Sequence, residues 1–228
     1  MGHKYDWASI PSYIPKVMKA FPLTIEILLL SLLFSLIIGA LVAVGALSKN
    51  KVARAVTKGW ISFMRGIPTL VLIFLLYLGL PQLMNALGVN MSGISKTTYI
   101  VACLALSTSA NMAEMMRAAY LSVNKGQREA AYSVGMKPFT AFRRIVFPQA
   151  LGVAIPTLGN NIIMLFKETS LAFTIGVIDI LGRARALSSA SYGTNRLEIY
   201  IATVCFILEK LTKLVEKMYT RGRKQAAS

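Results

Sequence analysis

The sequence predicts an all-α integral membrane protein with about five transmembrane helices, and three observations support this fold class. Hydrophobic residues make up 55% of the 228 residues, and the mean hydropathy is +0.59, which is well above the range of soluble domains. These residues gather in blocks near the length of about 20 residues that a helix needs to cross a bilayer. Basic residues lie mostly between the blocks, as they do in membrane proteins.

The hydrophobic blocks define the predicted spans. They run over residues 23–47, 67–80, 98–120, 151–166 and 199–215. Pro22 is suited to the start of the first helix, and Pro81 is expected to end the second. The second block is short for a span, so we expect residues 60–64 to extend it at its start.

The distribution of Lys and Arg predicts the orientation. With five spans the two ends of the chain lie on opposite sides, and seventeen of the 25 basic residues fall on the side that holds the C-terminus. The richer side is cytoplasmic under the positive-inside rule. We therefore expect an external N-terminal segment over residues 1–21 and one transmembrane domain over residues 22–218. A basic cytoplasmic tail over residues 219–228 would lie against anionic lipid headgroups.

The net charge of +16 admits a second interpretation, a nucleic-acid-binding protein. Such proteins concentrate basic residues on a soluble surface, whereas this chain places them between hydrophobic blocks. We therefore predict membrane lipid, and no nucleic acid, as the partner of these charges. Cys103 and Cys205 lie inside hydrophobic blocks, where cysteine acts as a small hydrophobic side chain, so neither a disulfide framework nor a metal site is expected.

The cytoplasmic loop over residues 118–148 is too long to lack structure in a compact protein. Gly126 is expected to end the helix of the third span, and residues 127–134 to form a short helix that Gly135 ends. A further helix over residues 138–148 would begin and end at its two prolines. The short helix is either a docking element for a soluble partner or a loop helix packed on its own bundle, and the pattern alone leaves both open.

Six residues of this loop resemble the EAA loop of binding-protein-dependent ABC importer permeases. The family pattern is Glu-Ala-Ala, three residues, Gly, nine residues, Ile, any residue, Leu and Pro. The matching residues are Glu129, Ala130, Ala131, Gly135, Ile145 and Pro148, with Phe147 in place of the usual Leu. Residues 65–68, 77–81 and 167–171 are similar to the branch of this family for polar amino acids such as histidine, glutamine, arginine and cystine.

The resemblance implies a type I ABC importer permease of the bacterial inner membrane that translocates a polar amino acid, with cystine or a cationic amino acid as candidates. It also implies two permease subunits (a homodimer or a pair of paralogues), two copies of an ATPase subunit and an external solute-binding protein. The loop would transmit closure of the ATPases to the membrane bundle by a rigid-body transition. Because the chain has no Gly-x-x-x-x-Gly-Lys-Ser/Thr phosphate loop, ATP and Mg²⁺ would bind the partner ATPases. The chain itself would hold no cofactor and catalyse no reaction.

Polar and ionisable residues near the membrane need a reason, because a charge at mid-helix costs about 2.5–3.5 kcal/mol. Glu168 follows the fourth block, Thr169 and Ser170 come next, and Asn161 lies two turns earlier. A break in the helix at this point would expose these side chains to a water-filled path, and the alternative is a turn at the membrane surface. Given the resemblance, we predict that Glu168 binds the amino group or a cationic side chain of the substrate, with Thr169, Ser170 and Asn161 beside it.

Glu114 and Arg117 lie one turn apart within the third block, and we expect them to form an ion pair. Two functions of other classes stay open. One is an ion-coupled carrier that acts alone, and the other is a membrane scaffold subunit with a docking loop. A lone carrier is expected to show internal repeats, and the five blocks show no convincing repeat.

Overall fold

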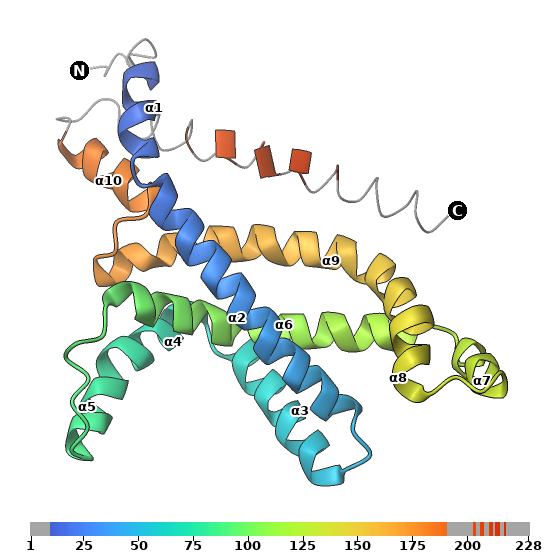
Figure 1. Ribbon diagram of the computed structural model, residues 1–228. Coiled ribbons are helices and arrows are strands. Elements are labelled where there is room, and N and C mark those ends of the chain that lie inside the picture. Colours follow the sequence, from blue (N-terminus) through green and yellow to red (C-terminus); the bar gives the residue numbers. More distant parts are fainter. Residues whose placement is uncertain are drawn as a thin grey trace. The chain divides into compact units, whose positions relative to one another are not determined.

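The computed structural model describes residues 10–190 and eight positions between 203 and 217, and all regular structure in this part is helical. The helices are α1 (Ile10–Met18), α2 (Phe21–Leu47), α3 (Lys51–Gly66), α4 (Thr69–Phe74), η2 (Leu75–Gly79), α5 (Leu80–Ala86), α6 (Lys96–Ser122), α7 (Lys125–Ser133), α8 (Pro138–Ala141), η3 (Phe142–Val146), α9 (Phe147–Glu168), η4 (Thr169–Ile175) and α10 (Ile180–Ala190). Figure 1 labels the α-helices. Here η2 and η3 are π-helical and η4 is a 3₁₀ helix.

Three helical segments of the described part are long and hydrophobic enough to cross a membrane. They are Phe21–Leu47, Thr69–Ala86 and Pro138–Ile175, which correspond to the first, second and fourth predicted spans. The third predicted span forms the 27-residue helix α6, whose polar side chains reduce its mean hydropathy. The fifth predicted span lies mostly outside the described residues. The count of five, the orientation and the domain boundaries stay predictions.

The second span gains its length at the opposite end from the one predicted. Residues 60–64 belong to α3, an amphipathic helix that begins where the Asn50 side chain accepts hydrogen bonds from two backbone N–H groups. This helix ends at Gly66, and the spanning segment begins at Thr69. The prediction that residues 60–64 extend the span is therefore wrong, because the helix instead continues past Pro81 to Ala86.

Two prolines that were expected to end helices are accommodated by π turns. The π turn η2 ends two residues before Pro81, and η3 ends two residues before Pro148. In both, the residue that precedes the proline donates its N–H to the carbonyl five residues earlier. A proline lacks an N–H and clashes with the carbonyl four residues earlier in an α-helix, and the wider π turn relieves this conflict. The prediction that Pro81 and Pro148 stop their helices is therefore wrong.

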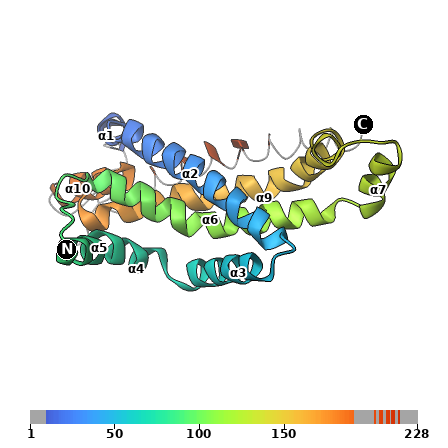
Figure 2. The same cartoon turned by 60° about the horizontal axis from the view of Figure 1, so that its bottom comes forward.

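Contacts divide the chain into two compact units. Unit 1 comprises Met1–Leu33, Pro68–Ala105 and Met164–Thr212, and unit 2 comprises Phe34–Ile67, Leu106–Ile163 and Lys213–Ser228. The core of unit 1 gathers buried side chains from α2, α4, α6, α9 and η4, among them Ile27, Ile73, Ile100, Leu104 and Leu165. Within the same unit α1 packs beside α10, as Figures 1 and 2 both show.

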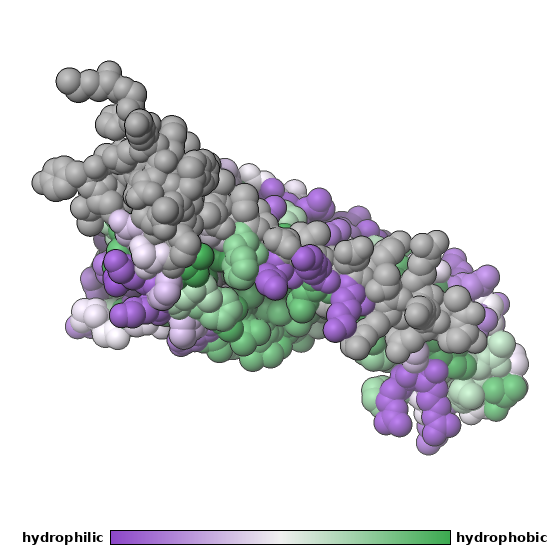
Figure 3. Space-filling view, turned by 90° about the horizontal axis from the view of Figure 1, so that it is seen from above, coloured by the Kyte–Doolittle hydropathy of each residue, from purple (hydrophilic) through white to green (hydrophobic). Residues whose placement is uncertain are grey.

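Three helices, α2, α3 and α6, contribute side chains to the core of unit 2. Ala43 of α2, Ile61 of α3 and Ala113 of α6 form a buried cluster, and the Trp60 indole donates a hydrogen bond to the Ser109 hydroxyl at 3.2 Å. Helix α2 turns many of its large hydrophobic side chains outward, including Leu29, Leu33, Leu41 and Val44. Figure 3 shows hydrophobic residues in a continuous area on one face of the molecule. Such a surface is suited to lipid.

Candidate functional site

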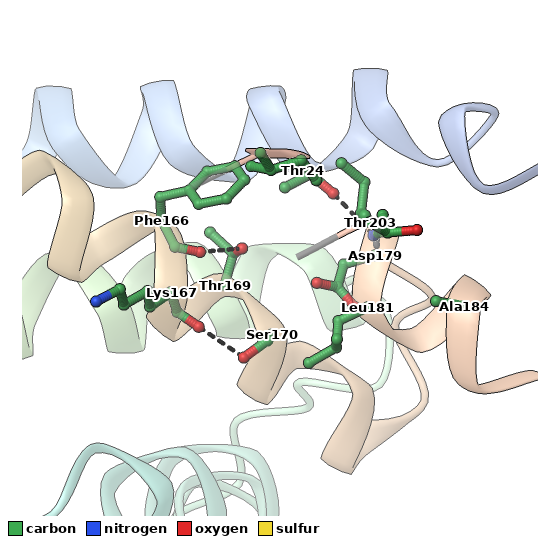
Figure 4. Close-up of a pocket in the computed structure, with 11 residues that line it drawn as sticks. Thr24, Phe166, Lys167, Thr169, Ser170, Asp179, Leu181, Ala184 and Thr203 are labelled. Carbon is green, nitrogen blue, oxygen red and sulfur yellow. Dashed lines mark hydrogen bonds between the residues drawn. The ribbon is translucent and has the colours of Figure 1, made fainter. Parts of the chain in front are cut away.

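A cavity of about 250 Å³ lies within unit 1, where the end of α9, η4, α10 and α2 meet. Its lining is mostly apolar, and its polar groups come from Thr24, Lys167, Thr169, Ser170, Asp179 and Thr203. Figure 4 shows Thr169, Ser170 and Asp179 around this cavity, with the ammonium group of Lys167 directed away from Asp179. The lining therefore holds two charged residues, of which Asp179 faces the two hydroxyl groups.

The α-helix α9 ends at Glu168, where the sequence left open a break or a surface turn, and the chain continues as the 3₁₀ helix η4. The hydroxyl groups of Thr169 and Ser170 donate to the carbonyls of Phe166 and Lys167 at 2.8 and 2.6 Å, and these bonds are drawn in Figure 4. Serine and threonine hydroxyls commonly satisfy carbonyls one turn earlier in this way. The hydroxyl oxygens keep lone pairs that can accept a hydrogen bond from an ammonium group in the cavity.

Asp179 is fixed at the cavity because it caps α10. Its Oδ1 accepts a hydrogen bond from the backbone N–H of Gly182 at 2.7 Å, which is the N-cap arrangement for a helix that begins at Ile180. The neighbouring N–H of Ile180 donates to the Thr24 hydroxyl at 3.0 Å, and that hydroxyl donates to the carbonyl of Ala20. Thr24 therefore joins α2 to the first turn of α10, beside the carboxylate.

Burial changes the acidity of Asp179, which lies beyond the last candidate span. The residue is 2% exposed, and this desolvation raises the pKa of its carboxyl group. The hydrogen bonds from backbone N–H groups, chiefly that of Gly182, and the charge of Arg185 oppose the rise. An ammonium group in the cavity would favour the ionised carboxylate further, since an opposite charge stabilises it.

The predicted substrate-binding residues do not all meet at this cavity. Thr169 and Ser170 line it. Glu168 accepts a hydrogen bond at 3.3 Å from the hydroxyl of Thr69, the first residue of α4, and it is not among the residues that line the cavity. Asn161 belongs to unit 2 and is buried there beside sulfur atoms of two methionines of α6. Substrate binding by these four residues stays a prediction.

The sequence analysis overlooked Asp179. The signal was a single acidic residue in the otherwise hydrophobic stretch over residues 171–182. An ionisable group in such a stretch indicates a functional or capping position, and its spacing to Gly182 fits a helix N-cap. Periodicity could not have shown that Thr24, more than 150 residues earlier, would lie against the same turn.

The predicted coupling loop forms its short helix, α7, within unit 2. Asn124 caps the start of the helix by accepting the N–H of Gly126, so Gly126 does not end the third span as expected. At the other end Gly135 has φ +80°, and the N–H groups of Gly135 and Met136 bond the carbonyls of Tyr132 and Ala131. This is a Schellman motif, for which glycine is favoured because it adopts positive φ without strain.

The matching loop residues divide between the surface and the interior. Ala131 is 3% exposed, whereas Glu129, Ala130 and Gly135 of the same short segment are exposed. In the following helix Ile145 is half-buried and Pro148 is exposed. Helix α7 thus has one buried residue, Ala131, and an outer face that is exposed in this chain.

An aromatic cluster holds α7 on the rest of unit 2. The Arg128 guanidinium of α7 donates a hydrogen bond to the phenol oxygen of Tyr120 in α6 and lies 5.2 Å from the centre of its ring. The Tyr120 ring lies 6.5 Å from Phe142 of η3, which lies 6.0 Å from Phe147 of α9. Arg128 and these three rings form a chain of contacts from the outer helix to α6 and α9. Nearby, Glu114 and Arg117 form the predicted ion pair at 2.8 Å.

Comparisons with known proteins agree with this fold. The sequence profile of the family described as "Binding-protein-dependent transport system inner membrane component" matches residues 10–211. The L-cystine transport system permease protein TcyL of Bacillus subtilis (strain 168) is 40% identical, over 98% of this chain and 95% of that protein. The glutamine transport system permease protein GlnP of Escherichia coli (strain K12) is 30% identical, with 90% of each chain covered.

A solved structure described as an amino acid ABC transporter with histidines is similar over 96% of this chain and 99% of that chain. Its TM-score is 0.80 at 30% sequence identity. A structure of the MetNI methionine ABC transporter has a TM-score of 0.72 at 16% identity, which shows the fold alone. The chain therefore belongs to the family of binding-protein-dependent transport system inner membrane components, and it is an inner-membrane permease of that family.

Proposed function

We propose that this chain is the permease subunit of an ABC importer that translocates a polar amino acid into the cell. The observation that carries the proposal is the family match over residues 10–211. The choice of cargo rests on relatives that transport cystine and glutamine, and the cavity with its carboxylate and hydroxyl groups is suited to an α-amino group. Cystine is the first candidate because the TcyL relative is 40% identical.

In this proposal the permease has five spans, with the N-terminus outside and the C-terminus in the cytoplasm. Residues 22–218 form one permease domain between an external segment and a basic tail. Two permease subunits, two ATPase subunits and an external solute-binding protein form the importer. ATP and Mg²⁺ bind the ATPases, and this chain performs no catalysis of its own.

The exposed face of α7 docks on an ATPase. Glu129, Ala130, Ala131 and Gly135, followed by Ile145 and Pro148, form the coupling loop, in which Ala131 and Arg128 attach the helix to unit 2. Rigid docking requires both an open outer face and a fixed inner face, and α7 has both. Closure of the ATPases would then displace α6 and α9 together with α7.

The substrate contacts in this proposal centre on Asp179. Its carboxylate binds the α-ammonium group, assisted by the oxygens of Thr169 and Ser170. Glu168 stands as a second candidate for a cationic part of the cargo, since only the Thr69 hydroxyl is bonded to its carboxylate within the described residues. Asn161 is the remaining candidate contact, in unit 2.

ATP-dependent uptake tests the function directly. The permease should be reconstituted in liposomes with its ATPase and binding protein, and uptake of radiolabelled cystine, glutamine, arginine and histidine should be measured. We expect one of these amino acids to accumulate only when ATP is inside and the binding protein outside. Uptake driven by an ion gradient without the ATPase would instead indicate a lone carrier, and a complex that hydrolyses ATP without moving any amino acid would contradict the proposal.

Replacing Asp179 by asparagine is expected to separate stability from transport. Asparagine also caps a helix well, so α10 should keep its start, while uptake should fall at least about tenfold because a neutral amide binds ammonium more weakly than a carboxylate. The folded-state pKa of Asp179 is raised, so ionisation of the buried carboxylate opposes folding as the pH rises through that pKa. The thermal stability of D179N relative to the wild type should therefore increase with pH. Equal uptake by D179N and wild type would remove Asp179 from the site, and Glu168→Gln tests the second carboxylate in the same assay.

A further inference from the structure

A second cavity, of about 350 Å³, lies wholly within unit 2, where α3, α6 and α9 meet. Its polar lining consists of Arg65, Asn111, Glu114, Thr157 and Asn161. Alanines of α6 and α9 and the backbone around them leave the space between these side chains open. No residue of this cavity lines the Asp179 cavity.

Asn161 is the most deeply buried polar side chain of this second cavity. It is 8% exposed, and its amide N–H groups point at the sulfur atoms of Met112 and Met115, both 3.9 Å away. A thioether is a weak acceptor, and a buried amide without strong hydrogen bonds is unfavourable. Within the described part of the chain the Asn161 carbonyl oxygen accepts no hydrogen bond. The carbonyl oxygen of Asn161 can therefore accept a hydrogen bond from a ligand.

The charged groups of the cavity, Glu114 and Arg65, also keep atoms that can bind a ligand. Both hydrogen bonds from Arg117 to Glu114 end on the same oxygen, Oε2, at 2.9 and 2.8 Å. The other oxygen of Glu114 accepts no hydrogen bond from the described residues. The Arg65 guanidinium forms no ion pair with any of these residues. A carboxylate oxygen and a guanidinium therefore line one cavity without neutralising each other in this state.

This combination matches one kind of ligand. A free α-amino acid carries a carboxylate and an ammonium group on the same carbon. Arginine binds a carboxylate through two parallel hydrogen bonds, and a carboxylate oxygen with an amide carbonyl accepts from an ammonium group.

We infer that the α3–α6–α9 cavity is a second binding site for the transported amino acid, with Arg65 on its carboxylate and Glu114 and Asn161 on its ammonium group. The inference rests on the proposed function, because it assumes an amino-acid cargo. In the proposed orientation Arg65 and Arg117 lie on the cytoplasmic side, so this site would hold the amino acid before its release into the cell. Each permease chain then has two sites, one in each unit.

Counting bound amino acid tests this inference. The complete permease–ATPase complex in lipid nanodiscs should be equilibrated with radiolabelled cystine, glutamine, arginine or histidine, and the amount bound per permease chain measured at saturation. Arg65 is exposed, so Arg65→Gln should not disturb folding, and Asn161→Leu removes the amide at nearly constant size. Asn160→Leu is the matched control, because Asn160 is the adjacent residue of α9 and is exposed outside the cavity.

We expect two molecules per chain in the wild type and in N160L, and one in R65Q, N161L and D179N. The double variant D179N/N161L should bind none. One molecule per chain in the wild type, abolished by D179N, would overturn the second site and leave the proposed function intact. Wild-type stoichiometry in R65Q would likewise overturn it. If no amino acid of the panel binds to any form, the proposed function itself fails.

Discussion

Replacing Gly39 by alanine is expected to destabilise the permease by about 1–3 kcal/mol, which is the usual penalty for overpacking a tight core. A Cβ atom at this position would lie 2.6 Å from the Cβ of Met112 and 3.1 Å from both the Ser109 oxygen and the Ala113 nitrogen. Two of these neighbours are backbone atoms of α6, which cannot move unless the whole helix moves. Gly39→Leu is expected to prevent accumulation of the assembled complex altogether.

Gly59→Ala is the matched control for this effect, because Gly59 is also helical and belongs to unit 2 but has nothing within 4 Å of an added Cβ. Alanine should stabilise that helix by about 0.5–1 kcal/mol. The measurement is the thermal unfolding midpoint of the purified complex, together with its yield from membranes. Equal midpoints for G39A and G59A would show that α2 and α6 do not pack as closely as the structure indicates.

Replacing Arg128 by leucine is expected to uncouple ATP hydrolysis from transport. The change removes a charge-assisted hydrogen bond to Tyr120, for which about 1.5–3 kcal/mol is typical, and a cation–π contact of about 0.5–1 kcal/mol. A loss of about 1.4 kcal/mol is already tenfold in an equilibrium. We therefore expect the amount of amino acid moved per ATP to fall about tenfold, because closure of the ATPases would then move α7 without displacing α6.

The readout that separates this effect from misfolding is the ratio of transport to hydrolysis. R128L should still co-purify with the ATPase and hydrolyse ATP, because the exposed face of α7 is unchanged. Tyr120→Phe keeps the ring contacts and loses only the phenol oxygen, so its ratio should lie between those of the wild type and R128L. Arg143→Leu removes an exposed charge from the same loop and should leave the ratio unchanged. A normal ratio in R128L would show that another contact transmits the motion.

Local sequence patterns predicted a structural feature correctly where all the residues that cause it lie within a short stretch of chain. Gly135 ends α7 as predicted, because a left-handed residue closes the helix through hydrogen bonds to its own last turn. The Glu114–Arg117 ion pair was predictable for the same reason, since both residues lie on one face of one helix. The prediction that helices end at Pro81 and Pro148 was wrong because it did not consider π turns, which accommodate a proline within a helix.

The sequence by itself determined that the chain is helical and suited to a membrane, that the loop over residues 118–148 holds a short helix, and which family it resembles. These conclusions follow from hydropathy, charge and spacing, which act over a few residues. Only the tertiary structure decided which polar residues share a cavity. It brought Thr24 to Ile180, the residue after Asp179, across 156 positions of sequence, turned Glu168 toward Thr69, and buried Asn161 against α6. Each of these depends on which helix faces which, and that is set by packing between segments far apart in the chain.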